Sequence, residues 1–294
     1  MKGVRELKRR LKGVKNIRKI TKAIELVAGT KLRRLQDRAA ATRPFAAQLE
    51  GILRRVAAYA DVHASPLLKA ADEVKRVAVI VIASDKGLCG SYNSNVFRAA
   101  TPFLRELKAA GKEADLYVLG RRAATFFGKL KDVRLEWVYP DALEKIEFKR
   151  VKALMGELVR RFVEDKVQEV VILYTAMKGA MSFKPTLQRV LPVPRPETGS
   201  KDASPPAVDY ILEPTPQEIM ARLLPRFLDM QLYAAILESL ASEFASRRAA
   251  MKNATDNADE MASALNKEYN KARQSGITAE LLEITGGAEA LRAV

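Results

Sequence analysis

The two ends of the chain carry apolar residues at helical spacing, and the middle carries short apolar runs of strand length. Near the C-terminus, the apolar positions follow one another at alternating steps of four and three residues, as in the seam of a coiled coil. The series is 230, 234, 237, 241, 244, 248, 251, 255, 258, 262, 265, 269, 272 and 276, and only Arg248, Thr255 and Gly276 are not Met, Ala, Leu, Phe or Tyr. This pattern predicts a long helix that pairs along one face.

The boundaries of this C-terminal helix are predicted from its flanking residues. Thr215, Pro216 and Glu218 form a capping box with proline at the first helical position. Gly286 and Gly287 predict its end. The helix would span about 105 Å at 1.5 Å per residue, so it needs a partner of similar length.

A second apolar stripe runs along the N-terminal segment. It comprises Val4, Leu7, Leu11, Val14, Ile17, Ile20, Ile24, Val27, Leu32, Leu35 and Ala39. Steps of three around Val14 to Ile20 predict local overwinding of the seam, and Pro44 predicts a kink or a break near Arg43. Because the middle segment is too small to cover either stripe along its full length, we expect the two helices to pack on each other, antiparallel.

Between these helices, apolar runs alternate with helical patterns, which is typical of an α/β domain with a parallel sheet. The predicted strands are residues 76–84, 115–119, 133–138 and 169–175, with weaker candidates at 187–193 and 208–212, and the predicted helices are 95–110 and 149–166. We therefore predict a long antiparallel coiled coil with an inserted Rossmann-like α/β domain. Its segments are an N-terminal shaft helix (1–62), the globular domain (70–213) and a C-terminal shaft helix (215–290) that pairs with 1–62.

Charge and composition narrow the function. The chain of 294 residues has a net charge of +16, and residues 1–38 hold fourteen Lys or Arg against three Asp or Glu. We expect an acidic partner. One cysteine, Cys89, and one histidine, His63, exclude a disulfide framework and a zinc cluster. The apolar run from Val77 to Ala83 is too short to span a bilayer, and we expect no bound cofactor or metal.

The loop from Ser84 to Gly90, SDKGLCG, is the strongest local candidate for chemistry. It follows the first predicted strand, where α/β sheets often place ligands. Lys86 next to a cysteine could serve a nucleophilic enzyme. Since His63 is the only histidine and the glycines suit a tight turn, we favour a structural role for Cys89.

Four segments together resemble the gamma chains of F-type ATP synthases. They are residues 19–28 (KITKAIELVA) with 31–34, residues 84–90 (SDKGLCG) with 93–95, residues 251–258 (MKNATDNA) and residues 269–281 (YNKARQSGITAEL). The resemblance implies a non-catalytic central rotor stalk that couples proton or sodium flow to ATP synthesis or hydrolysis. Its implied partners are the alpha and beta subunits of the catalytic ring, the epsilon subunit and the membrane ring of c subunits, at the cytoplasmic face of a bacterial inner membrane. No direct membrane insertion and no nucleic acid are expected.

The resemblance also implies particular contact residues. Ile24, Arg247, Arg273, Gln274 and Thr278 stand at positions where the family touches the alpha and beta ring. A weaker assignment, based on charge, is an ionic track for acidic loops. It consists of Lys15, Arg18, Lys19 and Lys22, which share a helix face.

Some residues depart from the family pattern. Ile24 and Leu26 replace common methionines, Gly29 and Thr30 replace a small pair, and Arg248 replaces an apolar seam residue. Two other functions stay open from the residues alone. One is a basic coiled-coil module that binds nucleic acid through its first helix, although that helix lacks aromatic residues for stacking. The other is an α/β enzyme that uses Cys89.

Overall fold

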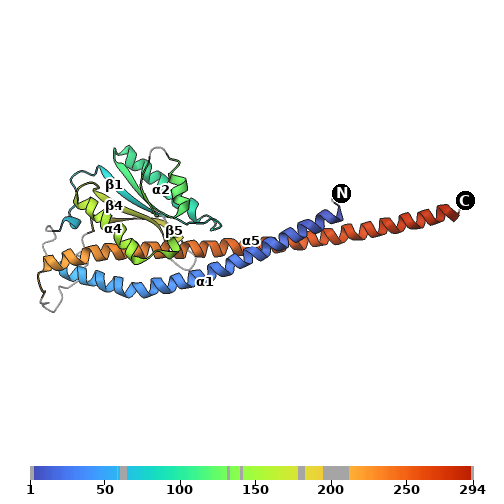
Figure 1. Cartoon of the computed structure of the whole chain (residues 1–294), viewed down its shortest axis with the longest axis horizontal. Coiled ribbons are helices and arrows are strands. Elements are labelled where there is room, and N and C mark those ends of the chain that lie inside the picture. The colour runs from blue at the N-terminus through green and yellow to red at the C-terminus, as the bar shows by residue number, and fades with distance from the viewer. Residues whose placement is uncertain are drawn as a thin grey trace, which may run out of the picture. The chain divides into compact units, whose positions relative to one another are not determined.

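The computed structural model describes residues 3–57, 59, 65–130, 133–139, 142–177, 183–194 and 212–292. The chain forms two compact units, and we call them the helix pair and the sheet unit. The helix pair comprises Met1–Gly29 with Arg247–Val294, and the sheet unit is Thr30–Ser246. Each unit contains part of both long helices, α1 (Val4–Ala57) and α5 (Pro216–Arg292) (Figure 1). The three predicted domain segments stay a prediction.

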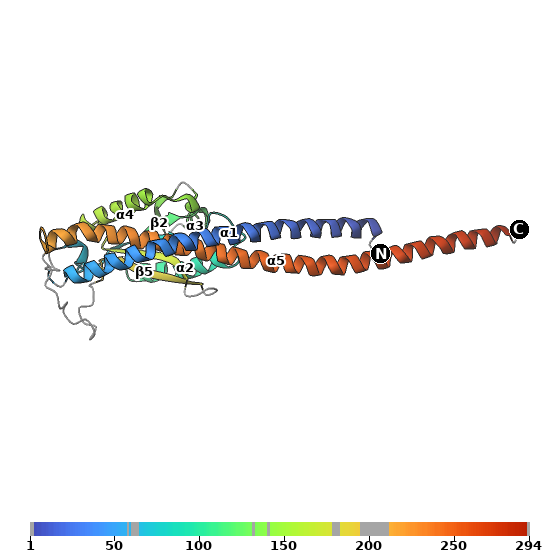
Figure 2. The same cartoon turned by 90° about the horizontal axis from the view of Figure 1, so that it is seen from below.

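The sheet unit is built on five strands in the order β3-β2-β1-β4-β5. The strands are β1 (Arg76–Ile82), β2 (Glu113–Leu119), β3 (Arg134–Val138), β4 (Glu169–Met177) and β5 (Phe183–Leu191). β1 to β4 pair in parallel, and β5 is antiparallel to β4. Helices α2 (Tyr92–Ala109), α3 (Arg121–Phe127) and α4 (Phe148–Val163) connect the parallel strands, with short 3-10 turns η2 (Pro66–Leu68) and η3 (Leu143–Lys145) (Figure 2). The predicted α/β class with long terminal helices is confirmed.

Three details of the predicted elements were wrong or fall outside the described residues. The sequence analysis missed α3, because seven residues are too few for a helical period to stand out. It also started the fifth strand at residue 187, whereas β5 begins at Phe183. Residues 208–211 of the last strand candidate lie outside the described residues, and Leu212 is not in a strand.

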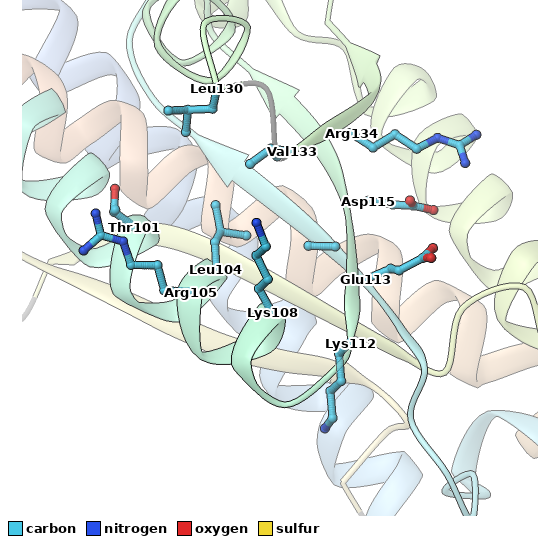
Figure 3. Close-up of a pocket in the computed structure, with 11 residues that line it drawn as sticks. Thr101, Leu104, Arg105, Lys108, Lys112, Glu113, Asp115, Leu130, Val133 and Arg134 are labelled. Atoms are coloured by element: carbon cyan, nitrogen blue, oxygen red, sulfur yellow. The ribbon is translucent and has the colours of Figure 1, made fainter.

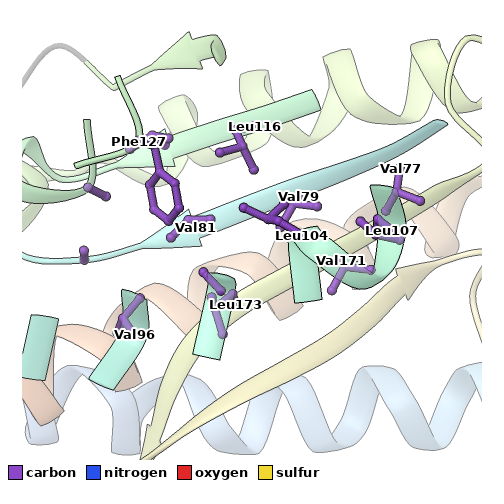
Figure 4. Close-up of a cluster of buried hydrophobic side chains, with 14 residues drawn as sticks. Val77, Val79, Val81, Val96, Leu104, Leu107, Leu116, Phe127, Val171 and Leu173 are labelled. Atoms are coloured by element: carbon purple, nitrogen blue, oxygen red, sulfur yellow. The ribbon is translucent and has the colours of Figure 1, made fainter. Parts of the chain in front are cut away.

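Alternate residues of the central strands bury different faces of the sheet, because side chains alternate along a strand. Val77, Val79 and Val81 of β1 pack with Leu104 and Leu107 of α2 (Figure 4). The side chains of Ala78, Ile80 and Ile82, which point to the opposite face, are also fully buried. Both faces of β1 are therefore covered, which explains its continuous apolar sequence.

A buried ionic network joins α4 to β2 and β3. Arg161 Nη2 donates to Asp115 Oδ2 at 2.8 Å, and its Nη1 donates to the Tyr117 hydroxyl at 2.5 Å and lies 2.9 Å from Glu136 Oε1. Asp115 and Arg161 are 1% and 7% exposed. The cost of burying these charges is offset only because each has a partner.

One glycine is required by close approach. Gly120 has a φ of +103°, and a Cβ at this position would lie 2.2 Å from the carbonyl oxygen of Ala83. Only glycine permits this turn from β2 into α3. The turn brings α3 against the loop after β1.

The predicted helix boundaries had mixed outcomes. Thr215 caps α5, since its Oγ1 accepts the Glu218 amide at 3.3 Å. The predicted stop at Gly286 and Gly287 was wrong, because α5 continues to Arg292. Helical glycine costs only about 1 kcal/mol relative to alanine, so the two glycines do not end a long helix. The break considered at Pro44 was also wrong, because α1 runs through it.

Candidate functional site

The helix pair is antiparallel, as the sequence predicts. The Thr255 hydroxyl donates to Thr21 Oγ1 at 2.8 Å, and Arg18 forms an ion pair with Asp259. Residue numbers on α1 rise as those on α5 fall, which defines opposite directions. Leu7, Leu11 and Ala28 of α1 and Met251 and Ala258 of α5 are the buried apolar residues of this unit.

The apolar stripe of α1 follows the buried seam only in part, since Leu7 and Leu11 are buried as predicted. Ile17, Ile20 and Val27 are 54%, 59% and 53% exposed, so their predicted place in the seam was wrong. Thr21 and Ala28 are buried instead, seven residues apart. The pair of Thr21 and Thr255 keeps the heptad spacing of the seam. Because Ile17 and Ile20 are not in the seam, the steps of three that predicted overwinding are not part of it. The consequence is a face of α1 with exposed isoleucines and valine.

The seam of α5 is confirmed along most of its length. Seven of the fourteen predicted positions are buried, namely Met230, Leu237, Ala241, Phe244, Met251, Thr255 and Ala258. Arg248 is exposed. A Cβ built on Gly29 would lie 3.7 Å from Arg248 Cδ, so the two departures from the family pattern meet across the helix pair. The aliphatic part of the arginine lies over the glycine.

The implied ring contacts do not form one cluster. Arg273, Gln274 and Thr278 are exposed within six residues of α5, and the Thr278 hydroxyl donates to the Gln274 carbonyl at 3.0 Å. Arg247 is 26 residues earlier, about 39 Å along the helix, and only 7% exposed. Ile24 of α1 is half-buried. The arrangement gives one accessible group on α5 and a separate, largely buried arginine.

The proposed ionic track has four exposed cations on α1. Two of them have partners within the helix pair. Arg18 pairs with Asp259, and Lys22 Nζ lies 3.1 Å from Glu25 Oε2. Lys15 and Lys19 form no ion pair among the described residues. Lys15 and Lys19 therefore have the charge most available to an acidic partner.

A serine face on α5 was missed by the sequence analysis. Ser239 Oγ lies 2.8 Å from the Tyr92 hydroxyl and accepts the Thr175 amide at 3.3 Å. Ser242 donates to the Thr175 carbonyl at 3.1 Å, and Ser246 donates to the Cys89 carbonyl at 2.7 Å. The spacing of three and four residues between these serines was the available signal.

This serine face packs against the carboxyl-terminal part of β4. In open α/β sheets, ligands bind at the carboxyl ends of strands, where the strand order reverses. Here β1 and β4 are neighbours with crossovers to either side, and α5 contacts the end of β4 through Ser239 and Ser242. Burial raises the pKa of the Tyr92 phenol far above its usual range, and the charge of Glu243 raises it further. The phenol stays neutral in this contact.

The loop after β1 has a structural role, as we favoured. Cys89 is 2% exposed, and its Sγ accepts from Asn93 Nδ2 at 3.2 Å. Asp85 accepts the Arg121 amide at 3.2 Å and the Leu143 amide at 2.8 Å, which ties the loop to α3 and η3. A buried thiol with these partners is not placed for nucleophilic attack on a substrate.

The described residues form neither a metal-binding cluster nor a membrane-spanning helix. No group of three or more His, Cys, Asp or Glu residues in the described ranges is arranged to hold a metal ion. No described helix is long and apolar enough to cross a membrane. His63 lies outside the described residues.

Comparison with known proteins gives consistent matches along the whole chain. The family model described as ATP synthase matches residues 3–291. The ATP synthase gamma chain of Geobacter metallireducens is 38% identical over 292 residues, covering 99% of this chain and 100% of that one. The ATP synthase gamma chain of Leptospira biflexa is 39% identical over 287 residues, covering 98% of each.

Solved structures share the fold. A chain of the Euglena gracilis mitochondrial ATP synthase (OSCP, F1 and c-ring) matches with a TM-score of 0.66 and 18% identity, over 99% of this chain and 95% of that one. A chain of the Tetrahymena thermophila enzyme (central stalk and c-ring) matches with a TM-score of 0.58 and 22% identity, over 80% and 99%. The comparisons give no support to the nucleic-acid alternative.

Proposed function

The chain belongs to the gamma chain family of ATP synthases, and from this premise we propose that it is the non-catalytic rotor shaft of such a complex. The observation that carries the proposal is the unlike sides of the helix pair. α1 exposes Ile17, Ile20 and Val27 beside Lys15 and Lys19, whereas the outer part of α5 exposes Arg273, Gln274 and Thr278. A shaft with unlike sides touches equivalent partner sites differently as it turns.

The mechanism needs only unequal contact energies. A partner site responds to the shaft by as much as its contacts differ between the two states of that site. For a tenfold change in a nucleotide affinity, this difference is about 1.4 kcal/mol. Two or three charge-assisted hydrogen bonds, each contributing about 1.5 to 3 kcal/mol, supply it. Arg273 and Gln274 carry the donors for such bonds.

The proposal assigns partners to separate parts of the chain. The helix pair contacts the alpha and beta subunits through Arg273, Gln274 and Thr278, with Ile24 on α1 as a second contact. Lys15, Arg18, Lys19 and Lys22 attract acidic loops of the same ring. The sheet unit binds the epsilon subunit and the c ring, at the cytoplasmic face of a bacterial inner membrane.

Arg247 has a different proposed role from the other contact residues. Its side chain is 7% exposed, so it acts by holding α5 in position instead of reaching a partner from the surface. An Arg247→Lys substitution keeps the charge and loses the planar guanidinium. We expect this variant to assemble with the ring and to lose part of the coupling between hydrolysis and proton transport.

The test is reconstitution of the complex with Arg273→Ala/Gln274→Ala. We expect ATP hydrolysis and proton-driven synthesis to fall by about tenfold or more, because charged hydrogen bonds are lost. The matched control is Lys149→Ala/Arg150→Ala, which removes exposed side chains from α4. Unchanged rates in the first variant, with normal assembly, would contradict the contact assignment.

A separate experiment tests the partners. Pull-down of the full chain from membranes should bring six nucleotide-binding ring subunits per copy. The isolated chain should not hydrolyse ATP. Hydrolysis by the isolated chain that disappears with Cys89→Ala would contradict the non-catalytic role.

A further inference from the structure

A cavity lies beside the loop that follows β1, within the sheet unit. It has a volume of about 320 Å³ and is lined by the loop 87–90, the first turns of α2 and the face of α3 with the turn after it. The stacked rings of Phe97 and Phe126, whose centroids are 4.3 Å apart, form one wall. This volume is at the small end of the range for ligand pockets.

The charge of this cavity is positive. Arg122 and Lys129 line it, and no carboxylate does so among the described residues. Neither cation has an ion-pair partner in the described part of the chain. The loop's own carboxylate, Asp85, is bound to the amides of Arg121 and Leu143. The cavity therefore has two cations whose charge is not neutralised by nearby carboxylates.

A glycine of the loop makes room for one of these cations, Arg122. A Cβ built on Gly87 would lie 2.9 Å from Arg122 Nη2, so the glycine lets the guanidinium lie directly against the loop. The planar fork of arginine suits an oxyanion with two acceptors on one side. Gly87 and Arg122 together form the mouth of the cavity.

The remaining polar groups limit what the ligand can be. The Thr125 hydroxyl donates to the Arg121 carbonyl at 2.9 Å, and the Asn93 amide donates to Ser84 and Cys89. The donors left for a ligand are Arg122, Lys129 and the Ser94 hydroxyl, which has no hydrogen bond among the described residues. With two cations and no carboxylate among the described lining residues, the cavity favours an anion.

We propose that this cavity binds a small oxyanion of the class of inorganic phosphate or a small phosphate ester. Arg122 would bind two oxygens, while Lys129 and Ser94 would bind the others. Nothing in the family comparisons assigns this site, and the proposal does not depend on the shaft function. The Ser84 to Gly90 loop thus has a ligand role beside its structural one.

A second cavity of the sheet unit is less suited to bind a small anion. It has a volume of about 660 Å³ at the amino ends of β2 and β3. In Figure 3, the side chain of Lys108 lies between α2 and β2, whereas the side chains of Arg105 and Lys112 point away from that of Lys108. Its cations do not converge on one point, so a small ligand would meet one of them at a time.

The single cysteine of the chain gives a direct test. Cys89 lines the phosphate cavity and is 2% exposed, so alkylation by the neutral reagent iodoacetamide requires the loop to open. A ligand that binds only the closed loop slows alkylation by one plus the ratio of its concentration to its dissociation constant, about tenfold at ten times that constant. We expect inorganic phosphate to give this saturable slowing in the full chain.

Two double variants distinguish the loss of specific phosphate contacts from the loss of positive charge in general. Arg122→Gln/Lys129→Gln should abolish the slowing, whereas Lys149→Gln/Arg150→Gln, with the same charge loss on α4, should keep it. Ser94→Ala, a milder change, should weaken phosphate binding by a few fold. Equilibrium dialysis with labelled phosphate should rank the variants in the same order.

Three results would overturn the proposal. The first is no slowing by phosphate beyond that of chloride at equal ionic strength. The second is equal slowing in both double variants. The third is that acetate slows alkylation as much as phosphate does, since a site that binds any carboxylate ligand would then explain the data. Because these measurements use the chain without the ring, they can fail while the shaft function stands.

Discussion

The sheet unit and the helix pair bury their residues to different extents. In the sheet unit, β1 is covered on both faces, and Val77, Ile80 and Ile82 are fully buried. In the helix pair, burial is confined to a seam, and Ile277, Leu281, Leu282 and Ile284 of α5 are 49% to 68% exposed. The central strand of the first region is covered by its own chain. The second keeps apolar surface for a partner.

The largest expected effect tests burial in the sheet unit. Arg161→Ala leaves Asp115 buried without its partner, which should lower the free energy of unfolding by about 3 to 5 kcal/mol. Urea unfolding followed by the fluorescence of Trp137, the only tryptophan, reports this unit. The neighbouring Arg160→Ala removes exposed ion pairs and should lower the free energy of unfolding far less than Arg161→Ala does. Equal losses would remove the distinction between buried and exposed pairs.

The next effect concerns the contact between α5 and the sheet. Ser239→Ala leaves the Tyr92 hydroxyl and the Thr175 amide without their partner, both in buried positions. We expect a loss of about 1 to 3 kcal/mol, again measured by urea unfolding. Ser263→Ala, at an exposed position of α5, should stay within about 0.5 kcal/mol. A similar loss in both variants would mean that helix propensity, and not the contact, sets the result.

The sheet unit could be predicted from the sequence better than the helix pair could. Continuous apolar runs such as residues 76–84 report burial on both faces, and no competing arrangement suits them. The seam of α1 was partly misassigned because Ile17, Ile20 and Val27 are more apolar than the buried Thr21 and Ala28, and apolar character usually marks the buried side. A helix that packs on a partner protein as well as on another helix of its own chain has two apolar faces. The sequence alone does not say which face is used inside the chain.

The contact between Cys89 and α5 shows the same limit for the candidate site. The glycines of the loop predict a turn, but the hydrogen bond from Ser246 to the Cys89 carbonyl joins residues 157 positions apart. No local pattern encodes that distance. The implied contact residues came from the family resemblance, and the burial of Arg247 became visible only with the fold.

A smaller effect tests the register of the helix pair. Thr255→Val removes the hydroxyl that donates to Thr21, which should cost about 1 kcal/mol in local opening of α1. Adding Thr21→Val should cost less than the sum of the single changes, because the two hydroxyls share one bond. Hydrogen exchange of amides in residues 11–28 measures the opening. Strictly additive losses would indicate that the pair does not set the register.

The smallest effect tests whether Arg248 requires the glycine below it. A Cβ at Gly29 would meet Arg248 Cδ at 3.7 Å, an ordinary contact distance, so Gly29→Ala should fit and stabilise α1 by up to about 1 kcal/mol. Gly13→Ala is the matched control, because nothing lies within 4 Å of its Cβ, and it should give the same gain. Gly29→Leu should lose this gain, since a longer side chain would displace the arginine. If alanine at position 29 destabilised the helix pair while alanine at 13 did not, Gly29 would be needed for close packing. The packing of α1 in the helix pair would then tolerate substitution as poorly as the core of the sheet unit does.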